Sequence, residues 1–219
     1  IKRAQEFLHA GESYEVCLTD TYTAAAEGEL YRQLRSHNPA PYAAHLVFDG
    51  VEVCSASPER FLTVRGREVE AKPIKGTISA DQDPALLTTD PKTRAENLMI
   101  VDLLRNDLSR VCEPGSVRVP KLMQVESYAT VHQLVSTITG QLRANATAVD
   151  ALRATFPPGS MTGAPKLRTC EIIDQLETGP RGVYSGVVGY LGFDGQSDLS
   201  VVIRTAVRAA GEVTIGAGG

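Results

Sequence analysis

Four short strand-like segments joined by tight turns limit most strongly how this chain can fold. Residues 42–72 carry short stretches of β-branched and aromatic side chains, and Asp49-Gly50 and Arg65-Gly66 are typical of two-residue hairpin turns. Hairpins join strands that run in opposite directions, so this block predicts an antiparallel sheet. The expected strands cover residues 45–48, 51–54, 61–64 and 68–72.

The rest of the chain alternates helices and strands without a regular β-α-β rhythm. The clearest helix is expected over residues 91–111, where Asp90 is a suitable N-cap, Pro91 suits the first helical position, and apolar residues 98, 101, 104, 108 and 111 share a face. Other helices are expected before Gly11 and over residues 24–36, 149–154 and 165–177. Other strands are expected over residues 14–18, 128–142, 186–193, 199–208 and 212–215. This mixture favours an α+β fold, rich in antiparallel sheet, over a doubly wound sheet.

Composition narrows the function classes. Hydrophobic residues make up 42% and charged residues 22% of the chain, as in ordinary globular proteins. The net charge of −4 argues against nucleic-acid binding, which favours basic surfaces, so small molecules or proteins are the expected partners. The four cysteines are far apart and no pair has C-x-x-C spacing, which predicts free thiols and a reducing cytoplasm.

The apolar runs and the two ends of the chain indicate whether we expect a membrane span, a signal peptide or a complete domain. The longest apolar run, residues 183–193, contains three glycines and is too short to span a membrane. The first residues are charged where a signal peptide needs an apolar core. The chain starts without Met and ends on Gly-Ala-Gly-Gly, so we expect one domain over residues 1–219 that is incomplete at both ends.

Two side chains are candidates for covalent and proton-transfer chemistry. Lys75 lies in Pro-Ile-Lys-Gly-Thr at residues 73–77, between two backbone constraints. A lysine at a strand end usually points into water, but a desolvated one can act as a nucleophile. Glu59 follows a turn into a strand, so it is either a proton donor or a partner of Arg60.

Candidate anion and metal sites are weaker. Glu96, near the start of the long helix, is favoured by the helix dipole or is a carboxylate ligand for Mg²⁺. The Pro/Gly-rich loop at residues 158–163 and the glycines at 216–219 offer backbone N–H groups to an anion, although a flexible tail also explains the latter. His132 fits a satisfied core histidine, and Arg204, in a β-rich stretch, faces either solvent or a buried anion.

Six segments together resemble one family, the chorismate-utilising enzymes. They occur in the family's order and span nearly the whole chain. The segments are YEVCLT at 14–19, SPERF at 57–61, PIKGT at 73–77, RAENLMIVDLLRNDL at 94–108, FPPGSMTGAPK at 156–166, and residues 203–205 with 216–219. The resemblance implies a chorismate-binding catalytic domain with helices packed outside its sheets.

The resemblance also assigns residue roles. It implies that Glu96 is a Mg²⁺ ligand and that His132 lies near the substrate ring. It further implies that Pro41 and Tyr42 belong to a pocket that binds tryptophan in several members. The residues that would contact chorismate are Gly76, Thr77, Tyr184, Arg204, Gly216, Ala217 and Gly218. Such a set suits a dianion, because a cation, a metal and backbone amides offset two carboxylates.

Lys75 selects a branch of the family. Members that release pyruvate or add water usually carry Ala at this position, and those that add water have a lysine where this chain has Glu15. The resemblance therefore implies the branch that makes aminodeoxychorismate for p-aminobenzoate or folate. In that reaction Lys75 adds at ring carbon 2, Glu59 assists departure of the 4-hydroxyl, and ammonia from a glutamine amidotransferase partner, separate or fused, then displaces Lys75.

Two alternatives remain open at this point. One is an anthranilate-synthase-like lyase that tolerates Lys75, and the other is a non-catalytic binding fragment. In the family, an acidic stretch beyond the Gly-Ala-Gly-Gly segment supplies a second metal carboxylate. Since this chain stops at Gly219, we expect the 219 residues alone to bind Mg²⁺ poorly and turn over slowly.

Overall fold

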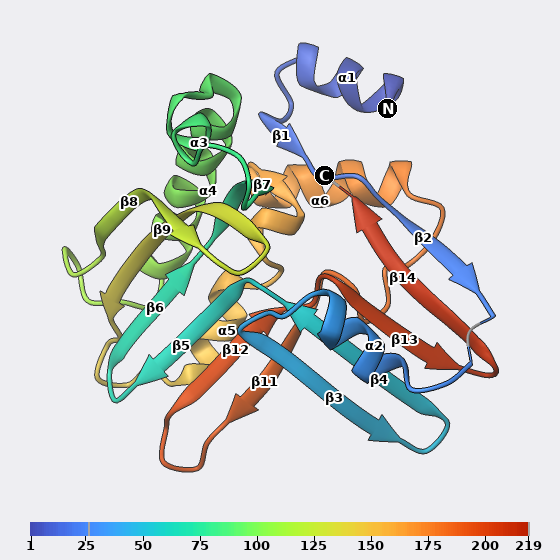
Figure 1. Cartoon of the computed structure of the whole chain (residues 1–219). Coiled ribbons are helices and arrows are strands. Elements are labelled where there is room, and N and C mark those ends of the chain that lie inside the picture. The colour runs from blue at the N-terminus through green and yellow to red at the C-terminus, as the bar shows by residue number, and fades with distance from the viewer. Residues whose placement is uncertain (26, 219) are drawn as a thin grey trace.

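The computed structural model describes residues 1–25 and 27–218 and contains three antiparallel sheets. The largest has seven strands in the order β11-β12-β5-β6-β9-β7, with β8 also paired to β9. Its strands are β5 (Arg60–Arg65), β6 (Glu68–Lys72), β7 (Ile74–Ser79), β8 (Arg118–Ser127), β9 (Val131–Gln141), β11 (Val187–Leu191) and β12 (Ser197–Val201). This sheet lies on the left and lower part of Figure 1.

The second sheet has five strands in the order β2-β14-β13-β4-β3, and a third pairs only β1 with β10. In Figure 1 the five-stranded sheet lies on the right, and β1 runs into β2 beside the end of β14. The strands are β1 (Glu15–Val16), β2 (Thr19–Ala24), β3 (Tyr42–Phe48), β4 (Val51–Ser57), β10 (Gly163–Ala164), β13 (Thr205–Ala209) and β14 (Glu212–Gly218).

The helices lie outside the sheets, as expected (Figure 1). They are α1 (Lys2–His9), α2 (Leu30–His37), α3 (Ala85–Thr89), α4 (Pro91–Ser109), α5 (Ala148–Thr155) and α6 (Lys166–Leu176), with a short 3-10 helix at Gly159–Met161. Among the described residues, no helix has the length and apolar character needed to cross a membrane. The four cysteines are free thiols, as their spacing predicted.

The main core lies between α4 and the seven-stranded sheet. Ile100, Leu104 and Leu108 of α4 pack in one cluster with Leu62 of β5 and Ile138 of β9, and all five are buried. Burying apolar side chains of this size is the dominant favourable term in folding, about 1.5–3 kcal/mol each. This packing fixes α4 against β7 and β9 and so holds the start of β7, where Lys75 lies.

Several sequence-based expectations are confirmed. The four strands of the hairpin block form β3 to β6, each at least as long as expected. The long helix starts at Pro91, and the Asp90 carboxylate accepts a hydrogen bond of 2.7 Å from the Thr93 backbone N–H. The mixed, mainly antiparallel α+β class is also confirmed.

Other expectations are wrong in their boundaries. Residues 19–24 form a strand, because they pair with β14, and the helix expected over 24–36 starts only at Leu30. The strand expected over 199–208 is two strands in different sheets, broken where Arg204 has a φ of 48°. Leu98 is 47% exposed and does not belong to the buried face of α4. The sequence did not predict β8, whose side chains are mostly exposed.

Candidate active site

Lys75 is held in a partly enclosed position at the start of β7. Its Nζ donates a hydrogen bond of 2.5 Å to Glu15 Oε1 and lies 3.5 Å from the Ser160 carbonyl oxygen. Only 14% of each side chain in the Lys75–Glu15 ion pair is exposed. The usual expectation, a strand-end lysine pointing into water, is therefore wrong.

Gly76 explains why α4 can approach this strand so closely. Its φ is 90°, and a Cβ at this position would lie 2.3 Å from Thr93 Cγ2. A side chain here would force α4 away from β7 and would also strain the backbone. The glycine beside Lys75 is thus required by a close approach between elements.

Glu15 reaches Lys75 because β1 pairs with β10, which follows the Pro/Gly-rich loop. Glu15 is the register partner of Ala164, and Val16 is the partner of Gly163. Gly163 has a φ of 131°, and a Cβ on it would lie 1.9 Å from the Glu15 carbonyl oxygen. Sequence reasoning did not propose Glu15 as a site residue, since nothing local indicates a partner 60 residues away.

Electrostatics keep the resting Lys75 amine protonated. Burial lowers the pKa of Lys75, but the charge and hydrogen bond of Glu15, together with the charges of Cys17 and Glu96, raise it by more. The net pKa lies above the ordinary value for lysine. Any nucleophilic role of Lys75 therefore requires proton transfer first, and Glu15 is the carboxylate in contact with that proton.

Glu59, between β4 and β5, is suited to proton transfer near neutral pH. It is 5% exposed, and burial raises its pKa from 4.5 to about 7, although Ser160, the Lys75 charge and the Ile74 backbone N–H oppose the rise. A carboxyl group with this pKa can donate a proton at pH 7. The alternative pairing with Arg60 is not observed, because Arg60 contacts Glu70 and Tyr42.

The loop before β10 positions Ser160 in this site. Ser160 joins Lys75 and Glu59, contacting the first through its carbonyl and the second through its side chain. Lys166 pairs with Asp107 at 2.6 Å and donates to the Thr155 carbonyl oxygen. The loop thus places an acceptor carbonyl beside the Lys75 cation.

Glu96 lies on α4, with its side chain 31% exposed and 3.5 Å from Lys92 Nζ. Its charge acts on Lys75, which places it within electrostatic reach of the Lys75–Glu15 pair. A carboxylate is the type of ligand that Mg²⁺ prefers, so the residue present fits one position of such a site. Among the described residues, the one cluster of three metal-binding side chains is elsewhere, at His45, Glu52 and Cys54.

The candidate substrate contacts at the C-terminal end form a second group. Tyr184 packs on Gly216, where a Cβ would lie 2.2 Å from the ring, and both line a cavity of about 300 Å³. Gly218 lies in β14 opposite Thr19, so the flexible-tail alternative is wrong for residues 216–218. Ala217 pairs with Asp20 in the same ladder. Gly219 lies outside the described residues.

Arg204 connects the two large sheets and is about half-buried. Burial lowers the pKa of its guanidinium. In the described part of the chain its guanidinium donates to Asn38 Oδ1 at 3.2 Å, and no carboxylate forms an ion pair with it. A partly desolvated cation of this kind is suited to binding an anion.

His132 and Thr77 lie on paired strands, β9 and β7. His132 Nε2 lies 3.1 Å from the Ala80 carbonyl oxygen, which can only accept, and its Nδ1 lies 2.8 Å from Ser127 Oγ. Both ring nitrogens therefore have structural partners. The next residue, Gln133, is buried and contacts Thr77.

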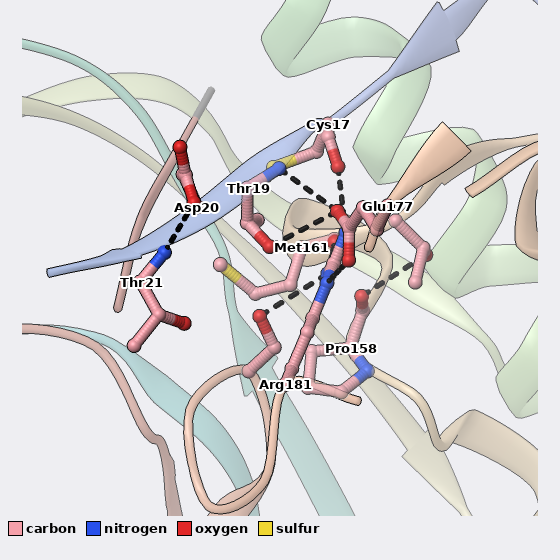
Figure 2. Close-up of polar contacts among 10 residues, drawn as sticks. Cys17, Thr19, Asp20, Thr21, Pro158, Met161, Glu177 and Arg181 are labelled. Carbon is pink, nitrogen blue, oxygen red and sulfur yellow. Dashed lines mark hydrogen bonds and ion pairs between the residues drawn. The ribbon is translucent and has the colours of Figure 1, made fainter. Parts of the chain in front are cut away.

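An arginine hub, which the sequence did not indicate, ties these segments together (Figure 2). Arg181 donates to the carbonyl oxygens of Cys17 and Met161 at 2.8 and 2.5 Å and pairs with Glu177 at 2.6 Å. Glu177 in turn accepts from the Thr19 N–H at 2.8 Å. The hub joins the β1–β2 segment, which follows Glu15, to the loop that carries Ser160.

Residues 1–219 match the family described as chorismate binding enzyme. The match covers the whole chain and agrees with the antiparallel fold and the enclosed Lys75–Glu15–Glu59 site. The chain belongs to this family.

Several named proteins are similar to this chain over its whole length. It is 52% identical over 233 residues to the probable aminodeoxychorismate synthase, chloroplastic, of rice, covering 100% of this chain and 26% of that protein. It is 48% identical to aminodeoxychorismate synthase component 1 of Klebsiella aerogenes, covering 100% of this chain and 51% of that protein. The crystal structure of anthranilate synthase component I from Streptococcus pneumoniae superposes with a TM-score of 0.91 at 38% identity, covering all of this chain and 50% of that one. The chain thus spans about a quarter to a half of the length of these relatives.

Proposed function

We propose that this chain is the chorismate-binding catalytic region of an aminodeoxychorismate synthase, which converts chorismate and ammonia to 4-amino-4-deoxychorismate for p-aminobenzoate or folate synthesis. One observation carries the proposal: a lysine, held by a carboxylate, lies in an enclosed site beside a carboxyl group whose pKa is raised to about 7. Relatives named for this activity are about half identical in sequence.

In the first step Lys75 gives its proton to Glu15, and its nitrogen forms a bond to ring carbon 2. The double bonds of the ring shift and the bond between carbon 4 and its hydroxyl oxygen breaks. Glu59 gives its proton to that oxygen, so water leaves. A covalent intermediate of this kind divides one difficult substitution into two easier ones.

In the second step ammonia adds at carbon 4, the double bonds shift back and the bond to Lys75 breaks. The Glu59 carboxylate takes one proton from the new ammonium group, and Lys75 regains its proton from Glu15. Each side chain returns to its starting state, and the net change is replacement of hydroxyl by amine with loss of water.

Binding of the dianion would use groups around this centre. Arg204, Tyr184 and the backbone at Gly216, Ala217 and Gly218 would bind one carboxylate. Gly76 and Thr77 would bind the ring near Lys75. Arg204 supports this role because it is partly buried with no carboxylate partner among the described residues.

Glu96 would hold Mg²⁺ as one ligand, and the bound metal would supply positive charge to offset the ring carboxylate. The ammonia would come from glutamine through an amidotransferase, and the words "component 1" in the name of the Klebsiella relative support a second component. We place the reaction in the cytoplasm, in keeping with four free thiols.

A second candidate is an anthranilate-synthase-like lyase, which the TM-score of 0.91 to an anthranilate synthase component supports. Its product would lack the enolpyruvyl group. The identity of the product therefore separates the two functions, because only the lyase releases pyruvate.

The test is incubation of the full-length protein that contains this chain with chorismate, ammonium and Mg²⁺, followed by mass spectrometry of the product. We expect an amine in place of the hydroxyl with the enolpyruvyl group retained, and loss of product in Lys75→Ala. Lys121→Ala, an exposed lysine on β8, is the matched control and should retain activity. Anthranilate with free pyruvate would support the lyase instead, and no turnover would leave the non-catalytic alternative.

A further inference from the structure

Two buried polar atoms near Lys75 have no hydrogen-bond partner among the described residues. They are Glu15 Oε2 and Gln133 Oε1. Buried polar groups in native proteins are nearly always paired, so each orphan calls for an explanation. The other Glu15 oxygen holds Lys75, which accounts for the position of that carboxylate. The amide of Gln133 has no such explanation in the mechanism above.

The position of Gln133 is fixed by the sheet. It lies on β9 directly opposite Thr77 of β7, and Thr77 is two residues from Lys75. Only 1% of Gln133 is exposed, and its Nε2 donates to Thr77 Oγ1 at 3.3 Å. With the amino group engaged in this way, the amide carbonyl is left as an acceptor without a donor.

His132, the neighbouring residue, has no such unpaired polar atom in its side chain. Successive side chains of a strand point to opposite faces, so His132 and Gln133 face different surroundings. Both His132 ring nitrogens have partners, at Ala80 and Ser127. Among these two β9 residues, Gln133 is the one with a free polar atom.

The reaction offers few donors that could satisfy this acceptor. At neutral pH both carboxylates of chorismate are ionised and its ether oxygen only accepts, so the 4-hydroxyl is the one donor on the substrate. The incoming ammonia, the other donor, attacks the same carbon. An acceptor in this site is therefore complementary to whatever group occupies carbon 4.

We propose that Gln133 is a specificity-determining residue whose Oε1 accepts a hydrogen bond from the donor at ring carbon 4 of chorismate. This inference rests on the proposed function, because it needs chorismate in the site. It adds a residue that selects a substrate bearing a hydroxyl at the carbon where the exchange occurs. A site that leaves a buried acceptor unpaired discriminates strongly against ligands without the hydroxyl.

The test measures equilibrium binding of two ligands, chorismate and an analogue that keeps both carboxylates but lacks the 4-hydroxyl. Wild-type protein should bind chorismate about 10- to 100-fold more tightly than the analogue. In Gln133→Met, which keeps the length of the side chain, the ratio should fall to about 1. Gln141→Met, at the exposed end of the same strand, is the matched control and should keep the wild-type ratio.

Each other outcome overturns the inference. A wild-type ratio near 1, a test that needs no variant to fold, removes it directly. Equal weakening of both ligands in Gln133→Met shows that the side chain supports the site without reading carbon 4. If wild type binds chorismate and discrimination survives in Gln133→Met, only this inference fails. If wild type binds neither ligand, the proposed function fails with it.

Discussion

Replacing Glu59 by Gln should stabilise the folded protein above pH 7 while it removes the proposed proton donor. Burial raises the pKa of Glu59 from 4.5 to about 7 in the folded chain, whereas the unfolded chain keeps the ordinary value. Because Glu59 is only 5% exposed, solvent screens this pKa shift little. Glutamine keeps the shape and carries no charge at any pH.

The direction in which stability changes with pH follows from proton linkage. Below pH 4.5 the carboxyl is protonated in both states, and its favourable contribution is fully present. As pH rises through about 7 the folded state must also lose the proton, so that contribution is lost. At ~1.4 kcal/mol per tenfold change in proton affinity, the total is about 3 kcal/mol. Most of it falls between pH 5 and pH 8.

Urea unfolding of wild type and Glu59→Gln at pH 5 and pH 8 measures this directly. Lost hydrogen bonds shift the variant by the same amount at both pH values, so the difference in pH dependence isolates the ionisation. Glu113→Gln, an exposed carboxylate paired with Arg67, is the control and should track wild type. Parallel pH dependence in wild type and Glu59→Gln would refute the reasoning.

The same variant should lose activity. A positioned general acid contributes about 10²–10⁴ to rate, so Glu59→Gln should lower kcat by that order. In wild type the first step needs the protonated carboxyl, and the rate should therefore fall as pH rises above about 7. A wild-type rate that keeps rising through pH 8 would contradict the role of Glu59 as donor.

Two further predictions concern how the site is held together. Arg181→Ala removes the ion-pair partner of a buried carboxylate and should lower the free energy of unfolding by about 3–5 kcal/mol. Arg105→Ala, which breaks an exposed ion pair, should lower it by less than about 1 kcal/mol. Equal effects of the two variants in urea unfolding would contradict the role of the hub. Gly163→Ala places a Cβ 1.9 Å from the Glu15 carbonyl oxygen, so it should displace β1 and lower both stability and activity. Gly115→Ala, where the added Cβ has no atom within 4 Å, is the control and should leave activity unchanged. Full activity in Gly163→Ala would show that β1 need not stay paired.

Local sequence signals predicted much of the fold. The Asp90 cap and Pro91 located the start of α4, and the Asp49-Gly50 and Arg65-Gly66 turns located hairpins, because each signal lies within the few residues that it organises. The same local view assigned no element to residues 19–23 and expected a helix from Ala24, whereas residues 19–24 pair with a strand almost 200 residues later. Strand pairing of this kind depends on a distant partner, which no local signal reveals.

Sequence motifs also selected the candidate site residues, but their environments needed the structure. Lys75 stood out because Pro73 and Gly76 flank it, and Glu59 because it follows a turn. Whether Glu59 paired with Arg60 or was a buried acid was open, since burial depends on what packs above a strand. The structure gave Arg60 other partners and left Glu59 enclosed.

By itself, the sequence determined the antiparallel α+β class, the caps and turns, and the set of residues able to do chemistry. Only the tertiary structure decided that Glu15 meets Lys75 across 60 residues, and that Gln133, beside the histidine singled out in the sequence, carries the unpaired atom. The physical reason is range. Periodicity, capping and turn chemistry act over a few residues, whereas a pKa, an ion pair or an orphaned acceptor depends on which distant segments pack together.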